Sequence, residues 1–207
     1  MMVSNDPFDW RGRDNEILKR VRQHPCCPRH FFDLFGSQQA VYRRLARLVE
    51  LKQLRLIGEI MVGDSGRPQK VYCNGWKPKP DQIRHEVLLT DFLFCYPSSY
   101  ITRGWLVNKD LRPDAEMTLG GIRFNVELDT GTESHSQVRR RQQVYVGSTE
   151  FVLFVTLSAR RLRGLTSKCL TAVKDICLFT TLDQVKTDPA GSIWIDSNGG
   201  QTSIVKS

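Results

Sequence analysis

Residues 112–134 read RPDAEMTLGGIRFNVELDTGTES and decide the fold of the second half of the chain. Two extended, largely apolar segments flank a pair of glycines, and this pattern predicts a hairpin with a tight turn. Glu127 and Asp129 are two residues apart, so on a strand both side chains point to the same face. Asp114 opens the neighbouring segment of the hairpin. We therefore expect three carboxylates to converge on one surface of a sheet.

The rest of the second half alternates between helical and extended patterns. A helix is expected after Asp81, and Pro97 ends it. The further extended segments are expected at 100–107, 114–119, 123–129, 151–157 and 176–180, and the further helices at 133–146 and 160–173. Because strands come first and then alternate with helices, this order predicts an α/β fold in which helices flank a mixed sheet.

The first half has the pattern of a small helical module. A helix begins at Asp14 and is closed by Pro25, and a short apolar segment follows. Ser37 is the expected N-cap of a longer helix whose buried stripe includes Leu45 and Leu48. Extended segments at 54–62 and 70–74, joined by a glycine-rich turn, predict a second hairpin.

Charge is distributed unevenly between the two halves. Pro78 and Pro80 break regular structure, so we expect two domains, residues 1–80 and 81–207. The first holds 15 Lys and Arg against 8 Asp and Glu, whereas the second holds 15 against 14. A compact basic domain beside a nearly neutral one is typical of a module that binds a polyanion, so nucleic acid is the expected partner.

The composition excludes other classes of protein. A content of 40% hydrophobic and 25% charged residues is that of a globular protein. No apolar run approaches the roughly 20 residues that cross a bilayer. The first residues contain acids and no apolar core, so no secretory signal is expected. These features predict a cytoplasmic protein that does not enter a membrane.

The order helix, helix, basic helix and hairpin over about residues 13–75 resembles a winged helix-turn-helix. The run Gly-Arg-Pro-x-Lys-x-Tyr at 66–72 is similar to the wing of many bacterial winged-helix regulators. The resemblance implies that the third helix enters the major groove of double-stranded DNA and that the wing reaches the neighbouring backbone. The residues expected to contact DNA are Gln38, Gln39, Tyr42, Arg43, Arg44, Arg47, Arg67 and Lys70. The alternatives are a solvated charged face and a winged helix that binds protein.

The acidic stretch carries a second resemblance. An acid on a first helix, Pro-Asp opening a strand and an acid-x-Lys motif on the next strand are the order of the PD-(D/E)xK nuclease superfamily. More narrowly, about residues 14–165 resemble the replication-relaxation family of plasmid and mobile-element proteins, which combine a winged helix with such a core. The matching residues are His85, Trp105, Pro113-Asp114-Ala115, Glu127, Asp129, Gly131-Thr132-Glu133-Ser134, Arg141 and Tyr145.

The nuclease resemblance implies a metal site. Asp114 and Glu127 would hold Mg²⁺ against the scissile phosphate, and Glu86 would be an outer acid. Asp129 stands where the superfamily has lysine, and a carboxylate cannot supply that positive charge. A working nuclease would then need a basic group from elsewhere, such as Arg123 or the run Arg139–Arg141.

Plainer interpretations of the same residues stay open. Asp129 or Thr132 would cap the following helix, with Glu133 near the positive end of its dipole. The run Arg139–Arg141 would screen the acids, hold phosphate or form a solvated face.

Three functions are compatible with the sequence. The first is a DNA-binding accessory or regulatory protein of plasmid replication, mobilisation or transposition, which works with other proteins of those processes. The second is a Mg²⁺-dependent endonuclease in which Asp114 and Glu127 hold the metal and Asp129 adds a ligand or orients water. The third is a transcriptional repressor whose second domain forms a homodimer. Residues 184–207 indicate no role.

Overall fold

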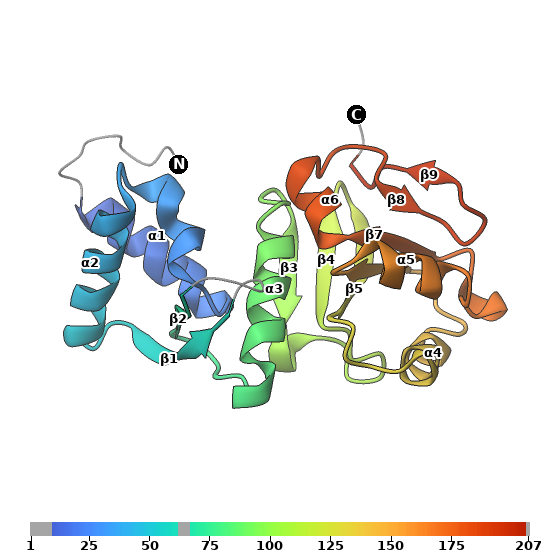
Figure 1. Cartoon of the computed structure of the whole chain (residues 1–207), viewed down its shortest axis with the longest axis horizontal. Coiled ribbons are helices and arrows are strands. Elements are labelled where there is room, and N and C mark those ends of the chain that lie inside the picture. The colour runs from blue at the N-terminus through green and yellow to red at the C-terminus, as the bar shows by residue number, and fades with distance from the viewer. Residues whose placement is uncertain (1–9, 62–66, 206–207) are drawn as a thin grey trace. The chain divides into compact units, whose positions relative to one another are not determined.

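The computed structural model describes residues 10–61 and 67–205, and contacts divide the chain into two compact units, Met1–Thr90 and Asp91–Ser207 (Figure 1). The first unit contains three helical segments followed by an antiparallel hairpin. They are α1 (Trp10–Gln23), the 3₁₀ helix η1 (Pro28–Leu34), α2 (Gln38–Glu50), β1 (Arg55–Ile60) and β2 (Gln69–Cys73).

Helix α2 forms as the sequence predicts. The Ser37 hydroxyl accepts a hydrogen bond from the Ala40 amide at 3.2 Å, which confirms the expected N-cap. Val41, Leu45 and Leu48 are fully buried, because their spacing puts them on one side of the helix. The opposite side of α2 is thereby left to polar residues.

The first unit extends beyond the boundary expected at Pro80. After the 3₁₀ turn η2 (Pro80–Gln82), the chain enters α3 (Ile83–Leu93), whose Ile83 and Val87 are buried in a cluster with the hairpin residue Val71. The Thr90 hydroxyl donates to the Pro25 carbonyl at 2.9 Å. The division at Thr90 therefore falls inside α3, because the first turns of this helix complete the core of the first unit.

The second unit is built on a seven-stranded mixed sheet in the order β3-β4-β5-β6-β7-β8-β9. Its strands are β3 (Tyr100–Arg103), β4 (Ala115–Leu119), β5 (Ile122–Asp129), β6 (Phe151–Thr156), β7 (Cys177–Thr181), β8 (Trp194–Ile195) and β9 (Gln201–Thr202). The pairs β5–β6 and β6–β7 are parallel, and the other neighbours are antiparallel. The α/β class with a mixed sheet and flanking helices is therefore confirmed.

Two helices cover the same face of the parallel strands. They are α4 (His135–Val144), between β5 and β6, and α5 (Ala159–Thr166), between β6 and β7. Val138 of α4 and Leu162 of α5 share one buried cluster with Phe154 and Phe179 of the strands. Phe154 and Phe179 are also register partners, so the two helices and the two strands share one hydrophobic core.

Several details differ from the sequence prediction. The segment expected to be extended to residue 107 leaves the sheet after Arg103 and turns at Gly104, whose φ of 66° favours glycine. The helix expected at 160–173 ends at Thr166 and is followed by the 3₁₀ turn η4 (Thr171–Val173). Helix α6 (Leu182–Thr187) and the two short strands after it carry no clear pattern in the sequence.

In the part of the chain that the structure describes, every helix is too short or too polar to cross a membrane.

Candidate functional site

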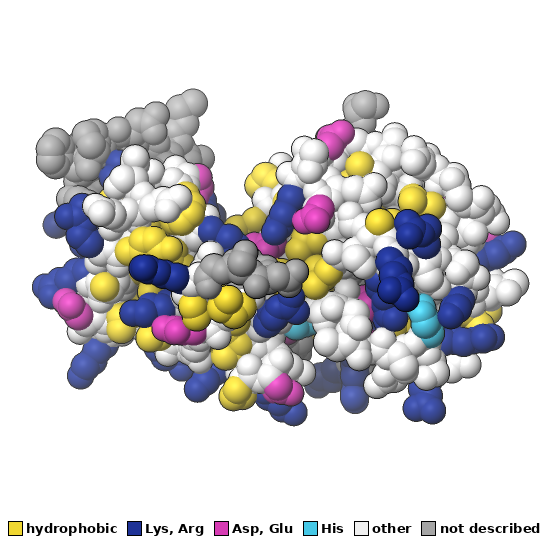
Figure 2. All heavy atoms as spheres, viewed as in Figure 1, with side chains coloured by type: hydrophobic (Ala, Val, Ile, Leu, Met, Phe, Trp, Pro, Cys, Tyr) yellow, Lys and Arg dark blue, Asp and Glu magenta, His cyan; other side chains and the backbone are white. Residues whose placement is uncertain are grey.

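The exposed side of α2 presents the polar residues expected to contact DNA. Four of these residues are exposed, and they alternate along the helix with the residues of the buried stripe. They are Gln38, Gln39, Tyr42 and Arg43. Figure 2 shows Lys and Arg side chains gathered over α2, at the left of the view. This side of the helix therefore offers amide, hydroxyl and guanidinium donors to a ligand.

Arg44 is engaged within the protein. Its Nε donates to Asp14 Oδ1 at 2.6 Å and its Nη2 donates to Asp14 Oδ2, so the fork is bidentate. The hydrogen bonds to Asp14 raise the pKa of Arg44 above its ordinary value. Arg44 thus ties α2 to α1, and the sequence analysis, which grouped it with the DNA contacts, did not foresee this partner.

Arg47 lies one turn further along α2 and keeps its exposure. Its Nη1 donates to Glu50 Oε2 at 3.0 Å, and both side chains are more than half exposed. Such a pair is weak because water screens it, so Glu50 can release Arg47 to a stronger anion. A shallow hollow on α2 is lined by Ala40, Arg43, Arg44 and Arg47.

The hairpin of the first unit carries the other two expected contacts. Arg67 and Lys70 are both exposed, and Lys70 lies opposite Glu59 in the strand register. The tip of the expected wing, at residues 62–66, lies outside the described residues.

The acidic stretch forms the expected hairpin in the second unit. Gly120 and Gly121 both have positive φ, at 57° and 80°, where a side chain would be strained. Asp114 precedes β4 and is fixed beside β5, because its amide donates to the Val126 carbonyl at 3.0 Å and its Oδ2 accepts from the Leu128 amide at 2.8 Å. Asp114 is thereby brought next to Glu127, as the sequence predicts.

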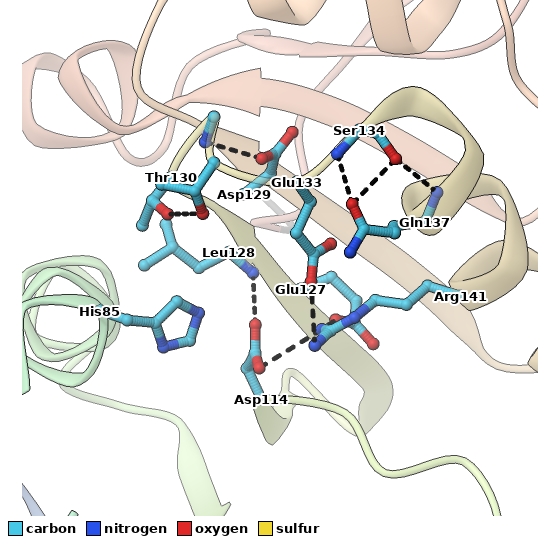
Figure 3. Close-up of polar contacts among 12 residues, drawn as sticks. His85, Asp114, Glu127, Leu128, Asp129, Thr130, Glu133, Ser134, Gln137 and Arg141 are labelled. Carbon is cyan, nitrogen blue, oxygen red and sulfur yellow. Dashed lines mark hydrogen bonds and ion pairs between the residues drawn. The ribbon is translucent and has the colours of Figure 1, made fainter. Parts of the chain in front are cut away.

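Arg141 of α4 occupies the space between these two acids. Its Nη1 donates to Glu127 Oε2 and lies 3.4 Å from Asp114 Oδ1. Its Nη2 lies 3.9 Å from Glu133 Oε1. Figure 3 shows the three carboxylates around this one guanidinium. We call Asp114, Glu127, Glu133 and Arg141 the acid cluster.

Glu127 is the buried centre of the acid cluster. Its side chain is 4% exposed, and its second oxygen accepts a hydrogen bond of 2.5 Å from the Tyr145 hydroxyl. Burial raises the pKa of Glu127 and the neighbouring charge of Asp114 raises it further, against the opposing effects of Arg141 and Tyr145. Burial lowers the pKa of Arg141, but the three carboxylates outweigh it and hold that pKa above its ordinary value.

Asp129 lies on the same face of β5 but has a different partner. Arg161 of α5 donates from Nε to Asp129 Oδ2 at 2.5 Å and from Nη2 to the Glu133 carbonyl at 2.7 Å. Asp129 Oδ1 accepts from the Gly131 amide at 2.8 Å. The three carboxylates of the hairpin are thus divided between two arginines, instead of sharing one ligand as expected.

The arginines that were expected to replace the lysine of the nuclease motif lie in different places. Arg141 is the member of its run that reaches Glu127, whereas Arg123 lies 3.2 Å from Glu150. Arg161 was not foreseen as a partner of Asp129. The sequence signal that could have revealed this pair is the position of Arg161 at the start of the helix that follows β6. Because β6 runs parallel to β5, the end of β6 lies next to Asp129.

Glu86 lies on α3 in the first unit, where its Oε1 is 3.8 Å from His85 Nδ1.

The N-cap of α4 is Ser134, which accepts from the Gln137 amide, so the expectation that Asp129 or Thr132 caps this helix is wrong. Helix α4 simply begins later than the pattern suggested.

The acid cluster, as arranged, does not fit the expected magnesium ion. The oxygens that would hold Mg²⁺ are those of Asp114 and Glu127, and Arg141 Nη1 already contacts one oxygen of each. Two cations cannot share this position because they repel strongly in a buried site. Within residues 10–61 and 67–205, no three His, Cys, Asp or Glu side chains form a metal-binding group. Ion binding would require Arg141 to leave.

No protein-family model matches the chain, and a search of the curated proteins finds no match either.

Proposed function

We propose that the chain is a DNA-binding accessory or regulatory protein that contacts duplex DNA through a winged helix in its first unit. The observation that carries this proposal is the exposed side of α2, which presents Gln39, Tyr42 and Arg43 opposite a buried Val and Leu stripe. Glutamine and arginine are the side chains that pair best with the edges of adenine and guanine in the major groove. The basic charge of residues 1–80 supports the same partner.

The order of elements supports a winged helix. Three helical segments precede an antiparallel hairpin, and α2 is the third of them. In this arrangement the third helix enters the groove and the hairpin approaches the adjoining phosphates. Arg67 and Lys70 would then contact the backbone, and Arg43 and Gln39 would contact bases.

The second unit is proposed to be a nuclease-like core that does not cut. Arg141 supplies a fixed positive charge where the nuclease resemblance implies an ion, and Asp129 stands in place of the lysine. The resemblance to the replication-relaxation family suggests plasmid replication, mobilisation or transposition as the process. The second unit would then position DNA or partner proteins for enzymes of that process.

A metal-dependent endonuclease is the second candidate. It is favoured by the close approach of Asp114, just before β4, and Glu127 of β5, which both contact Arg141. Arg141 is 39% exposed, so its side chain has a route out toward solvent. Asp114 and Glu127 would then hold Mg²⁺, which would activate water and stabilise the negative charge that develops on the phosphate.

The proposal is tested by the affinity for duplex DNA as a function of salt. Some six phosphate contacts give a slope of about −5 or steeper in a plot of log affinity against log salt concentration. The variant Arg43→Ala should lose about 1 to 3 kcal/mol of binding free energy on a preferred sequence. Arg22→Ala, which removes an exposed arginine of α1, is the matched control. A flat salt dependence, or equal affinities of the two variants, would remove the groove-binding proposal.

A further inference from the structure

The nearly neutral second half of the chain contains one strongly basic segment. Between His135 and Lys168 there are seven Lys and Arg and one acid, Glu150. The seven are Arg139, Arg140, Arg141, Arg160, Arg161, Arg163 and Lys168. Glu150 is already engaged by Arg123 and Asn125. The positive charge of this segment is therefore not neutralised by acids within it.

The seven cations divide into two groups. Arg141 and Arg161 turn inward and pair with Glu127 and Asp129. The other five are exposed, and none of them has an ion-pair partner among residues 10–61 and 67–205. The buried acids account for the inward pair, whereas no ion pair among the described residues accounts for the five outward cations.

Four of the outward cations belong to two helices that lie side by side, and the fifth, Lys168, follows α5. A Cβ atom added at Gly164 of α5 would lie 3.0 Å from the His135 ring at the start of α4. At the other end of α4, Gln142 Oε1 accepts from the Leu170 amide, which follows α5, at 2.9 Å. Lys and Arg side chains gather over α4 and α5 at the right of Figure 2. We call Arg139, Arg140, Arg160, Arg163 and Lys168 the basic surface.

We propose that the basic surface is a second DNA-binding site, which holds the phosphate backbone of a duplex without reading its bases. Arginine matches phosphate because its planar fork donates two parallel hydrogen bonds and stays charged at every physiological pH. This site lies on a different unit from α2 and does not depend on the proposed groove contacts.

The chemistry of the two helices selects duplex DNA over other polyanions. Single strands are bound by stacking bases on aromatic side chains, and neither α4 nor α5 contains Phe, Tyr or Trp. Helices that lie in a membrane surface expose an apolar face. Here Val138, Leu162 and Leu165 are buried in the core of the unit, and Val144 is the single large apolar side chain of α4 and α5 that is exposed, so these helices have no continuous apolar face outside. A charged, non-stacking surface fits the regular phosphates of a double helix.

The test uses the full chain with Arg139→Gln, Arg140→Gln, Arg160→Gln and Arg163→Gln combined. The control combines Lys77→Gln, Lys79→Gln, Arg84→Gln and Lys109→Gln, four exposed cations elsewhere whose loss changes the net charge equally. Binding to a duplex of random sequence is measured over a range of salt concentrations. Four lost phosphate contacts should make the slope of log affinity against log salt shallower by about 3 to 4, with little change in the control.

Three outcomes are decisive. A variant of the basic surface that binds as the wild type does, or a control that weakens binding equally, would overturn the proposal. Loss of binding to vesicles of anionic phospholipid, with DNA affinity unchanged, would instead assign the surface to a membrane. Urea unfolding of both variants checks that the fold is intact.

The groove-binding proposal is tested separately by the same proteins. The variant of the basic surface should keep the ratio of affinities for preferred and random sequences, because phosphate contacts carry no sequence information. Arg43→Ala should reduce that ratio. If Arg43→Ala leaves the ratio unchanged while the basic-surface variant loses affinity, the groove-binding proposal fails and the second site stands.

Discussion

Helices α2 and α4 each carry a cluster of arginines, and in both helices one arginine turns inward while its neighbours stay exposed. Arg44 reaches Asp14, and Arg141 reaches Asp114 and Glu127. Arg43 and Arg140, which precede them, remain exposed. Neighbouring arginines in one run therefore have different roles, and the acids that lie near each one decide which.

The two inward arginines differ in what they stabilise. Arg44 and Asp14 are 22% and 16% exposed, and together they join two helices by one bidentate pair. Arg141 faces three carboxylates, one of which, Glu127, is almost completely buried. Without a cation the acids around Arg141 would repel one another. An arginine therefore joins two helices in the first unit, whereas in the second unit an arginine neutralises a group of acids.

The largest effect is expected from Arg141→Ala. Removing one partner of a buried ion pair leaves the other charge uncompensated, and above about pH 8, where Glu127 is ionised, the loss should lower the free energy of unfolding by about 3 kcal/mol. Arg140→Ala, next in the chain but exposed, should change it by less than about 0.5 kcal/mol. Urea unfolding monitored by circular dichroism measures both. Similar losses in the two variants would contradict the assigned role of Arg141.

The pH dependence of stability tests the protonation of Glu127 in the acid cluster. Burial raises the pKa of Glu127 to about 8 from an ordinary value of 4.5. Between these pH values the folded chain binds more protons than the unfolded chain, so the free energy of unfolding should fall as pH rises from about 4.5 to about 8.

Glu127→Gln is the reference for this pH effect, because its amide does not titrate. The quantity to measure is the difference in unfolding free energy between wild type and Glu127→Gln at several pH values in the window. The wild type should lose stability relative to the variant as pH rises. A relative gain would mean that Arg141 holds the pKa of Glu127 below its ordinary value.

A smaller effect is expected from Arg44→Ala. The Asp14 pair is only partly buried, so its loss should lower the free energy of unfolding by about 1 kcal/mol. Arg43→Ala should leave stability nearly unchanged and act on DNA affinity alone. Thermal unfolding and DNA titration of both variants distinguish the structural role of Arg44 from the DNA-binding role of Arg43. The comparison fails if Arg43→Ala is the more destabilising of the two.

The helix caps provide the smallest contrast. Ser134 and Gln137 form a reciprocal capping box at the start of α4, whereas Ser37 makes a single cap bond at the start of α2. Ser134→Ala should therefore cost about 1 kcal/mol, and Ser37→Ala somewhat less. Chemical unfolding detects both. Equal losses in the two caps would mean that the Gln137 side chain adds nothing.

Much of the fold could be predicted because its signals are local. The hairpin at Gly120-Gly121 follows from a turn that needs positive φ, and α2 follows from its cap and its buried stripe. The parallel strand at 151–156 is a continuous apolar run, as expected for a strand covered on both faces. Short elements after Thr181 were missed because two-residue strands such as β8 carry too little pattern.

The candidate site could be predicted only in part. The approach of Asp114 to Glu127 follows from the hairpin register, which a Gly-Gly turn fixes. The arginine partners could not be deduced in the same way, because three consecutive arginines on a helix point in three directions about 100° apart. Arg141 faces the acids only because Val138 and Gln142 bury the adjoining side of α4. Tertiary packing, and not the local sequence, therefore determines which of the three arginines contacts the acids.

The central proposal is that the protein binds duplex DNA and does not cut it, because Arg141 lies between the acids that would hold a metal ion. The direct measurement is incubation of the full chain with supercoiled plasmid in Mg²⁺ and, separately, Mn²⁺, followed by gel electrophoresis before and after the protein is removed. We predict retarded plasmid before removal and intact supercoiled plasmid afterwards in both metals. Nicked plasmid that Glu127→Ala abolishes without loss of DNA affinity would contradict the claim and establish an endonuclease.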